Sequence, residues 1–172
     1  MSESADYIAG LPQSPHSAER LLHLLIELIA KTTDVGELTD DVIEASFEIK
    51  LDPFQADKKE HAARLTSEWN VALVVTDDES AGRMIELGFF DSNEETVAPL
   101  TEICGVDSSN FGTALVDAGY QERPIHGVHG EPSGKEYSRG PVRVVTQTRG
   151  EARQPPDKTS HECITSVWIQ RE

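Results

Sequence analysis

The fold is decided by an amphipathic stretch near the start of the chain, SAERLLHLLIELIAK, at residues 17–31. At about 100° per residue, its polar side chains fall on one arc of a helix. These polar residues are Glu19, Arg20, His23, Glu27 and Lys31. Leucine and isoleucine fill more than half of the circumference. A stripe this wide predicts a helix that lies against a sheet, or against a sheet and a second chain.

Strand patterns follow on both sides of the middle of the chain. Residues 43–51 alternate between apolar and polar side chains, which predicts a half-exposed strand of an antiparallel sheet. Residues 69–76 predict a more buried neighbour, with a helical turn or loop at 56–65 between the two. Residues 142–148 and 161–170 predict a final hairpin. The predicted core consists of Leu25, Leu28, Phe47, Ile49, Val71, Leu73, Val167 and Ile169.

Helix signals mark residues 77–119. Asp77 and Asp78 are good helix-capping residues, and Ser92 and Glu95 have the spacing of a capping box. Four glycines and two prolines at 123–140 predict a loop. The sequence therefore predicts a flexible tail at 1–13 and one α+β domain over 14–172. We expect an antiparallel sheet of about four or more strands, packed against the N-terminal helix, with a helical insertion at 77–119.

Charge is unevenly distributed along the chain. There are 31 acidic and 15 basic residues, and the net charge is −16. Residues 1–119 contain 24 acidic and 7 basic residues, whereas residues 120–172 contain 7 and 8. Phosphate groups are bound by clustered Lys and Arg, so this balance argues against direct binding to nucleic acid or to an anionic membrane.

Cysteine content and hydropathy bear on the compartment. Two cysteines, Cys104 and Cys163, do not make a disulfide scaffold and fit a reducing environment. The longest apolar run, residues 21–29, is too short to cross a bilayer. Residues 1–19, which precede this run, contain no basic side chain, whereas a secretory signal has a positively charged region before its apolar segment. We therefore expect a soluble, cytoplasmic protein.

No motif for catalysis or cofactor binding surrounds either cysteine, so we expect no catalytic residues and no cofactor. A zinc site formed by His126, His129, His161 and Cys163 is the alternative, because His161 and Cys163 share one face of a predicted strand. Their spacing matches no standard zinc finger. The sequence therefore predicts a protein without stoichiometric zinc.

The charge asymmetry predicts a binding protein with a basic protein partner. The candidate contact residues are Glu44, Glu48, Asp77, Asp78, Glu79, Glu94 and Glu95. Bacterial immunity proteins and other inhibitors of toxic nucleases offer a functional analogy, since an acidic face can block a phosphate-binding groove. Three alternatives remain open at this point. In the first, the excess of acidic residues only confers solubility. In the second, the protein is a small enzyme with a pocket bordered by the 123–140 loop. In the third, the chain is an assembly subunit that forms homodimers through the 17–31 helix.

Overall fold

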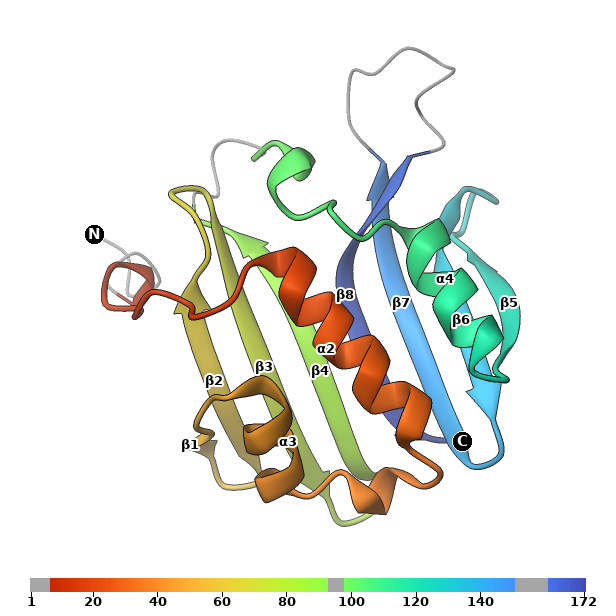
Figure 1. Ribbon diagram of the computed structural model, residues 1–172, viewed down its shortest axis with the longest axis horizontal. Coiled ribbons are helices and arrows are strands. Elements are labelled where there is room, and N and C mark those ends of the chain that lie inside the picture. Colours follow the sequence, from red (N-terminus) through yellow and green to blue (C-terminus); the bar gives the residue numbers. More distant parts are fainter. Residues whose placement is uncertain (1–6, 93–97, 151–160) are drawn as a thin grey trace.

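A computed structural model describes residues 7–92, 98–150 and 161–172. Its centre is one antiparallel sheet of eight strands, in the order β1-β2-β3-β4-β8-β7-β6-β5 (Figure 1). The strands are β1 (Asp52–Gln55), β2 (Lys58–Arg64), β3 (Trp69–Asp78), β4 (Gly82–Asp91), β5 (Gln121–His126), β6 (Pro132–Arg139), β7 (Val142–Gly150) and β8 (Glu162–Arg171). The α+β class and the antiparallel sheet are confirmed, and the sheet is larger than the roughly four strands that the patterns indicated.

Three helices lie on one face of this sheet (Figure 1). They are α2 (Ala18–Lys31), α3 (Asp40–Phe47) and α4 (Ser108–Asp117), with short 3-10 turns η1 (Val35–Glu37) and η2 (Leu100–Glu102). The long helix α2 crosses the middle of the sheet, α3 lies toward β1 and β2, and α4 lies toward β5 and β6. Among the described residues, no helix is both long and apolar enough to cross a membrane.

The strand predicted at 43–51 is wrong, because most of it forms α3. Thr39 caps this helix by accepting a hydrogen bond from the backbone N–H of Val42. Ile43 and Phe47 are both buried. They are four residues apart, a spacing that places two side chains on one face of a helix and also on one face of a strand. The apolar pattern alone therefore could not separate the two structures. The helix ends at Glu48, which adopts a left-handed conformation with φ of 55°.

The helical insertion predicted at 77–119 is also wrong over its first third. Asp77 and Asp78 end β3, and the chain returns as β4 after a tight turn at Gly82, where φ is +80°. The Asp78 carboxylate accepts the backbone N–H groups of Ser80 and Ala81, so it caps a turn and not a helix. The helix predicted from Ser92 falls partly outside the described residues. The last part of the predicted helical segment is confirmed, since Ser108–Asp117 form α4.

Two segments predicted as loops contain strands. Residues 58–64 form β2, inside the segment predicted as a helical turn or loop. Residues 123–140 form most of the β5–β6 hairpin. Gly134 lies within β6, where a Cβ atom would stand 1.8 Å from the carbonyl oxygen of Thr146. This glycine therefore permits close approach of two strands. The predicted final hairpin is confirmed as β7–β8, and most of the segment between its two predicted strands lies outside the described residues.

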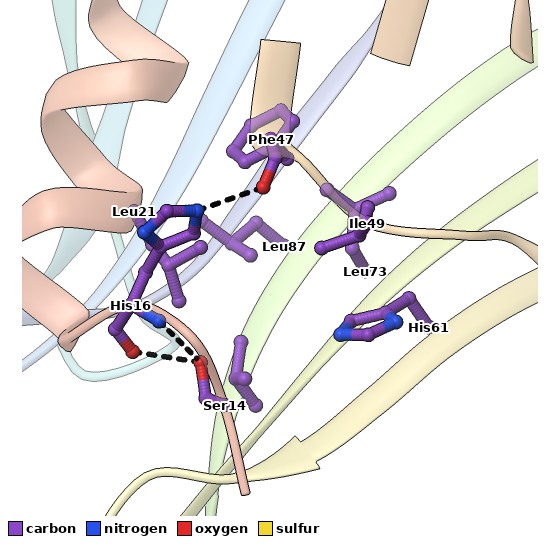
Figure 2. Close-up of a pocket in the computed structure, with 9 residues that line it drawn as sticks. Ser14, His16, Leu21, Phe47, Ile49, His61, Leu73 and Leu87 are labelled. Atoms are coloured by element: carbon purple, nitrogen blue, oxygen red, sulfur yellow. Dashed lines mark hydrogen bonds between the residues drawn. The ribbon is translucent and has the colours of Figure 1, made fainter. Parts of the chain in front are cut away.

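Helix α3 is attached to the chain that leads into α2. His16 Nε2 lies 2.9 Å from the carbonyl oxygen of Phe47, at the edge of a small cavity of about 10 Å³ (Figure 2). Apolar side chains from several elements line this cavity, and they include Leu21, Leu73 and Leu87. A space of this size holds at most about one water molecule. The core is therefore tightly closed around Phe47.

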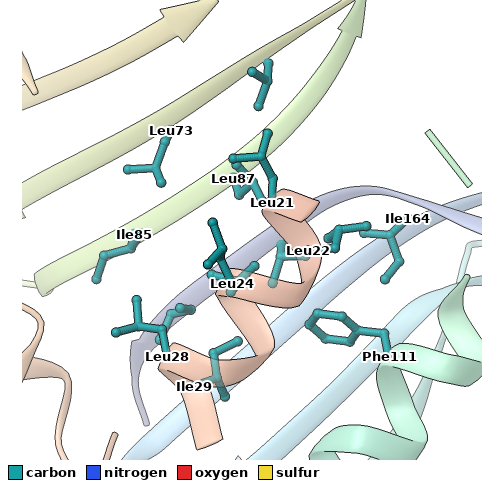
Figure 3. Packing of buried hydrophobic residues seen from close by; sticks show 14 of the residues in the cluster. Leu21, Leu22, Leu24, Leu28, Ile29, Leu73, Ile85, Leu87, Phe111 and Ile164 are labelled. Carbon is teal, nitrogen blue, oxygen red and sulfur yellow. The ribbon is translucent and has the colours of Figure 1, made fainter. Parts of the chain in front are cut away.

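The main core lies between the helices and the sheet. Leu21, Leu24 and Leu28 of α2 point toward strands β3 and β4, and Leu22 and Ile29 point toward Phe111 of α4 and Ile164 of β8 (Figure 3). All of these side chains are buried. Seven of the eight predicted core residues are buried, and the eighth, Ile49, is partly buried against the same cluster.

Candidate functional site

The order of the strands converts the charge asymmetry of the sequence into an asymmetry in space. Strands β1 to β4 occupy one side of the sheet in sequence order, and β8 to β5 occupy the other. Residues 1–91, which include β1 to β4, contain 19 acidic and 7 basic residues, whereas residues 120–172 contain 7 and 8. Residues 92–119, which include α4 beside β5 and β6, add five acidic and no basic residues. The half of the molecule that contains β1 to β4 is therefore the more acidic one, and we call it the acidic half.

Three chain segments that carry acidic residues meet at one end of the acidic half, and their backbones can be followed in Figure 1. The segments are the first turn of α3, the β1–β2 turn and the β3–β4 turn. The backbone N–H of Asp77 donates to the carbonyl of Asp57, which joins the two turns. Arg83 bridges Asp40 of α3 and Asp77 of β3. We call this group the acidic end, and it consists of Asp40, Asp41, Asp57, Asp77, Asp78 and Glu79.

Two cations hold part of the acidic end together. The Arg83 guanidinium donates to both carboxylate oxygens of Asp77, at 2.7 and 2.8 Å, and to Asp40. Its Nε donates to the carbonyl of Leu38 at 2.7 Å. Lys59 donates to the other oxygen of Asp40. Hydrogen bonds from Lys59 and Arg83 lower the pKa of Asp40, against the opposing effect of partial burial.

The remaining acids of this group face solvent. Asp41, Asp57, Asp78 and Glu79 are exposed. In the part of the chain that the structure describes, none of them forms a salt bridge. Hydrogen bonds from the side chain of Ser80 and from the backbone of Ala81 and Ser80 lower the pKa of Asp78. An open hollow of about 360 Å³ beside Asp41 is lined by Gly36, Thr39, Asp40, Asp41 and Arg83. The acidic end thus presents negative charge to a partner or to water.

The structure separates the predicted contact residues into three groups. Asp77, Asp78 and Glu79 belong to the acidic end, although on a strand and a turn and not on the predicted helix. Glu44 and Glu48 are on α3 and at its end, so the wet strand face predicted for them is wrong. Glu44 is bound by Lys50 and by the backbone N–H of Leu51.

Glu48 lies 3.5 Å from His16. Glu94 and Glu95 lie outside the described residues. Sequence reasoning missed Asp40, Asp41 and Asp57. The signal for the first two was present, since Thr39 followed by two aspartates is a helix start with acid in its first turn.

Of the four residues predicted as alternative zinc ligands, only His161 and Cys163 lie in one cluster. His126 ends β5 and His129 lies in the turn after it, whereas His161 and Cys163 are at the start of β8. Within the described residues, His161 and Cys163 instead gather with Cys104. Cys104 and Cys163 form a disulfide, a pairing that the sequence did not predict, because its two cysteines fitted a reducing environment. The pair is separated by 59 positions in the chain, a relation that spacing does not reveal.

One further groove opens where the sheet splits. Strands β4 and β8 pair only as far as Gly88 and Ser166, and a groove of about 370 Å³ lies beyond this point. The Arg149 guanidinium lies 5.6 Å from the ring centre of Trp69 there and 4.0 Å from Asp91. The described lining residues include no His, Cys or Lys. Its polar side chains include the hydroxyls of Thr165 and Ser166 and the carboxylate of Asp91.

No family model, no curated protein and no solved structure matches this chain. No function can therefore be carried over from a relative, and the residues of the acidic end are the basis for a proposal.

The ion pairs of Asp40 should make stability depend on pH. Because its folded pKa lies below the ordinary value of 3.8, the stabilisation is present above 3.8 and disappears as pH falls through the folded pKa. Asp40→Asn should therefore lower the free energy of unfolding by about 1 kcal/mol at neutral pH, and by nothing in strong acid. Urea denaturation at both pH values measures this, with Asp41→Asn as the control from the same helical turn. A difference between Asp40→Asn and the wild type that persisted in strong acid would show that the ion pairs are not its cause.

Proposed function

We propose that this chain is an acidic, non-enzymatic binding protein that recognises and blocks a basic protein partner, with the acidic end as its contact surface. The observation that supports this most is the segregation of charge: the acidic half ends in four exposed carboxylates that no described cation neutralises. We place this activity in the cytoplasm, and the partner class we favour is a protein whose basic groove binds phosphate. Carboxylates can occupy such a groove in place of phosphate, as inhibitors of nucleases do.

The physical advantage of this arrangement is fast association. Charge concentrated at one end of a molecule steers a partner of opposite charge into one orientation and raises the association rate. Asp40 and Asp77 contribute differently from their neighbours, because Arg83 and Lys59 already bind them. Their ion pairs hold α3 and the β3–β4 turn in a fixed relation. Asp41, Asp57 and Glu79 then remain available for the partner.

Two alternatives lose the features on which they depended. The pocket expected beside a 123–140 loop has no such loop to border it, since those residues form most of the β5–β6 hairpin. The leucines of α2 and Ile29, which were candidates for a homodimer contact, are buried within the chain, and Ile26 is partly buried. Neither enzymatic activity nor self-association through α2 is proposed further.

Charge reversal tests the proposal directly. The variant Asp41→Lys/Asp57→Lys/Glu79→Lys should slow association with the basic partner at least tenfold at low salt and flatten the salt dependence of the rate. All three residues are exposed, so folding should be retained. The partner is first captured from the native host on the immobilised wild-type chain and identified by mass spectrometry. Association rates are then measured by surface plasmon resonance at several salt concentrations.

A matched control changes the net charge by the same amount as the triple variant above, but at exposed acids elsewhere on the surface. Glu68, Asp117 and Glu172 are exposed acids outside the acidic end. The variant Glu68→Lys/Asp117→Lys/Glu172→Lys should therefore bind nearly as fast as the wild type. Equal slowing in both triple variants would mean that only net charge matters. If the captured partner is not basic, or the acidic-end variant binds it at the wild-type rate, the proposal is wrong.

A further inference from the structure

A cluster of three metal-ligating side chains, Cys104, His161 and Cys163, lies at the start of β8, and Asp107 lies beside its histidine. Cys104 follows η2, and Asp107 is the residue that caps α4 by accepting the backbone N–H of Asn110. An isolated bridge pairs Asp107 with Cys163 of β8, which brings the start of α4 against the strand. His161 lies two residues before Cys163. Three separate elements therefore bring Cys104, Asp107, His161 and Cys163 together.

The distances in this cluster resemble those between ligands of one zinc ion. The two ring nitrogens of His161 lie 3.8 and 3.9 Å from the sulfur of Cys104. Its Nε2 lies 3.3 Å from Oδ2 of Asp107. With zinc–ligand distances of about 2.0–2.3 Å, neighbouring ligands of a tetrahedron are about 3.3–3.8 Å apart. The ligand atoms of Cys104, His161 and Cys163 all lie within 4.8 Å of one another.

We propose that reduction of the Cys104–Cys163 disulfide creates a zinc site whose ligands are Cys104, Cys163, His161 and Asp107. Two sulfurs, one imidazole nitrogen and one carboxylate oxygen form a ligand set that zinc binds in tetrahedral geometry. In the oxidised chain the bond between the sulfurs uses both of them, so the same residues hold zinc in only one redox state.

The reaction is balanced with a dithiol as reductant. The dithiol gives two electrons and two protons to the Cys104–Cys163 bond, which breaks into two thiols, and the reductant becomes a disulfide. Both thiols then lose a proton as they bind Zn²⁺, because the thiolate is the ligand. In the reverse step a disulfide accepts two electrons from the zinc-bound thiolates and takes up two protons to become a dithiol, which re-forms the Cys104–Cys163 bond and releases the ion.

The setting favours a disulfide that can be reduced. Cys104 is partly exposed, whereas Cys163 is buried, so a reductant reaches the sulfur of Cys104. The inference also rests on the cytoplasmic placement proposed above, because disulfides in reducing compartments are usually transient and not purely structural. Zinc would replace the covalent link between the η2–α4 segment and β8 by a coordinative one. The two segments are then joined in both states, and only the ligand differs.

Elemental analysis of the full chain tests the site. The protein is purified without a metal-affinity step and reduced anaerobically with a phosphine. It is then incubated with zinc sulfate and separated from free metal by gel filtration. We expect one zinc per reduced chain and none in the oxidised chain. Cobalt in place of zinc should give the thiolate-to-cobalt absorption bands of a tetrahedral sulfur site.

Three variants separate specific ligation from unspecific binding. His161→Ala, at a side chain that is 49% exposed, should weaken zinc binding at least tenfold, measured by competition with a chelating dye. Asp107→Asn should weaken it while preserving the cap of α4, since asparagine caps helices equally well. His126→Ala, at the end of β5, is the control and should bind zinc like the wild type. A reduced chain with two titratable thiols that retains no zinc would overturn the proposal, as would wild-type affinity in His161→Ala.

Discussion

Phe47→Ala should lower the free energy of unfolding by about 3–5 kcal/mol, the range for removing a buried aromatic side chain. Phe47 has no exposed surface and packs at the end of α3 against α2 and the sheet. The neighbouring cavity is only about 10 Å³, so the wild-type packing leaves almost no free space around the ring (Figure 2). Removing the ring creates a void that the surrounding leucines fill only partly. The lost apolar contacts and the void both contribute to the cost.

Urea denaturation followed by tryptophan fluorescence measures this change, and Phe54→Ala is its control. Phe54 lies in the edge strand β1 and is 52% exposed, so its removal should change stability by less than about 0.5 kcal/mol. Phe47→Ala and Phe54→Ala both remove a phenyl ring, and both positions lie in the acidic half of the molecule, so the two variants differ mainly in the burial of the ring. Equal losses would mean that Phe47 is not part of the core that the structure shows.

Burial patterns were easier to predict than the type of element that carries them. Phe47 was predicted to be buried, and it is, although on a helix and not on a strand. Burial requires only that a residue be apolar at the right period, whereas Ile43 and Phe47 satisfy both periods at once.

Strand β4 was missed although its pattern is that of a strand only. Its alternation of buried side chains at Ile85, Leu87 and Phe89 is present in the sequence. The preceding aspartates favoured a helix because a capping residue and a turn residue have the same chemistry.

The candidate site was predictable as a charge excess but not as a surface. The availability of an acid for a partner depends on cations that lie far away in sequence. Asp40 is bound by Lys59 and Arg83, which are 19 and 43 positions away. Nothing local to Asp40 distinguishes it from Asp41, which is free of such partners among the described residues. The register of β2, β3 and β4 beside α3 places Lys59 and Arg83 next to Asp40 and not next to Asp41, and the sequence does not show this register.

The same reasoning applies to the cysteines. Cys104 has no histidine or cysteine near it in sequence, and the pairing with Cys163 depends on the whole segment between them returning to β8. Loop closure of this kind is a property of topology. The sequence identified two members of the metal-ligating cluster, His161 and Cys163, because these two residues share one strand.

Breaking the Cys104–Cys163 disulfide should lower the free energy of unfolding by about 4 kcal/mol in the presence of a metal chelator. The cross-link closes a loop of 59 positions, and the entropy that it removes from the unfolded chain grows with loop length. The cleanest comparison is the wild type before and after reduction, since no side-chain atom other than hydrogen changes. Urea denaturation in both states gives the difference.

The matched control is Cys104→Ala/Cys163→Ala, whose stability should not respond to the reductant. If the wild type loses no stability on reduction, the cross-link does not constrain the unfolded chain as its loop length implies. Zinc should distinguish the two roles of the sulfurs. A ligand that binds only the folded state stabilises it by an amount that rises with the logarithm of ligand concentration over Kd. Zinc in excess should therefore restore stability to the reduced wild type and leave the double-alanine variant unchanged, because only the wild type retains both thiolates.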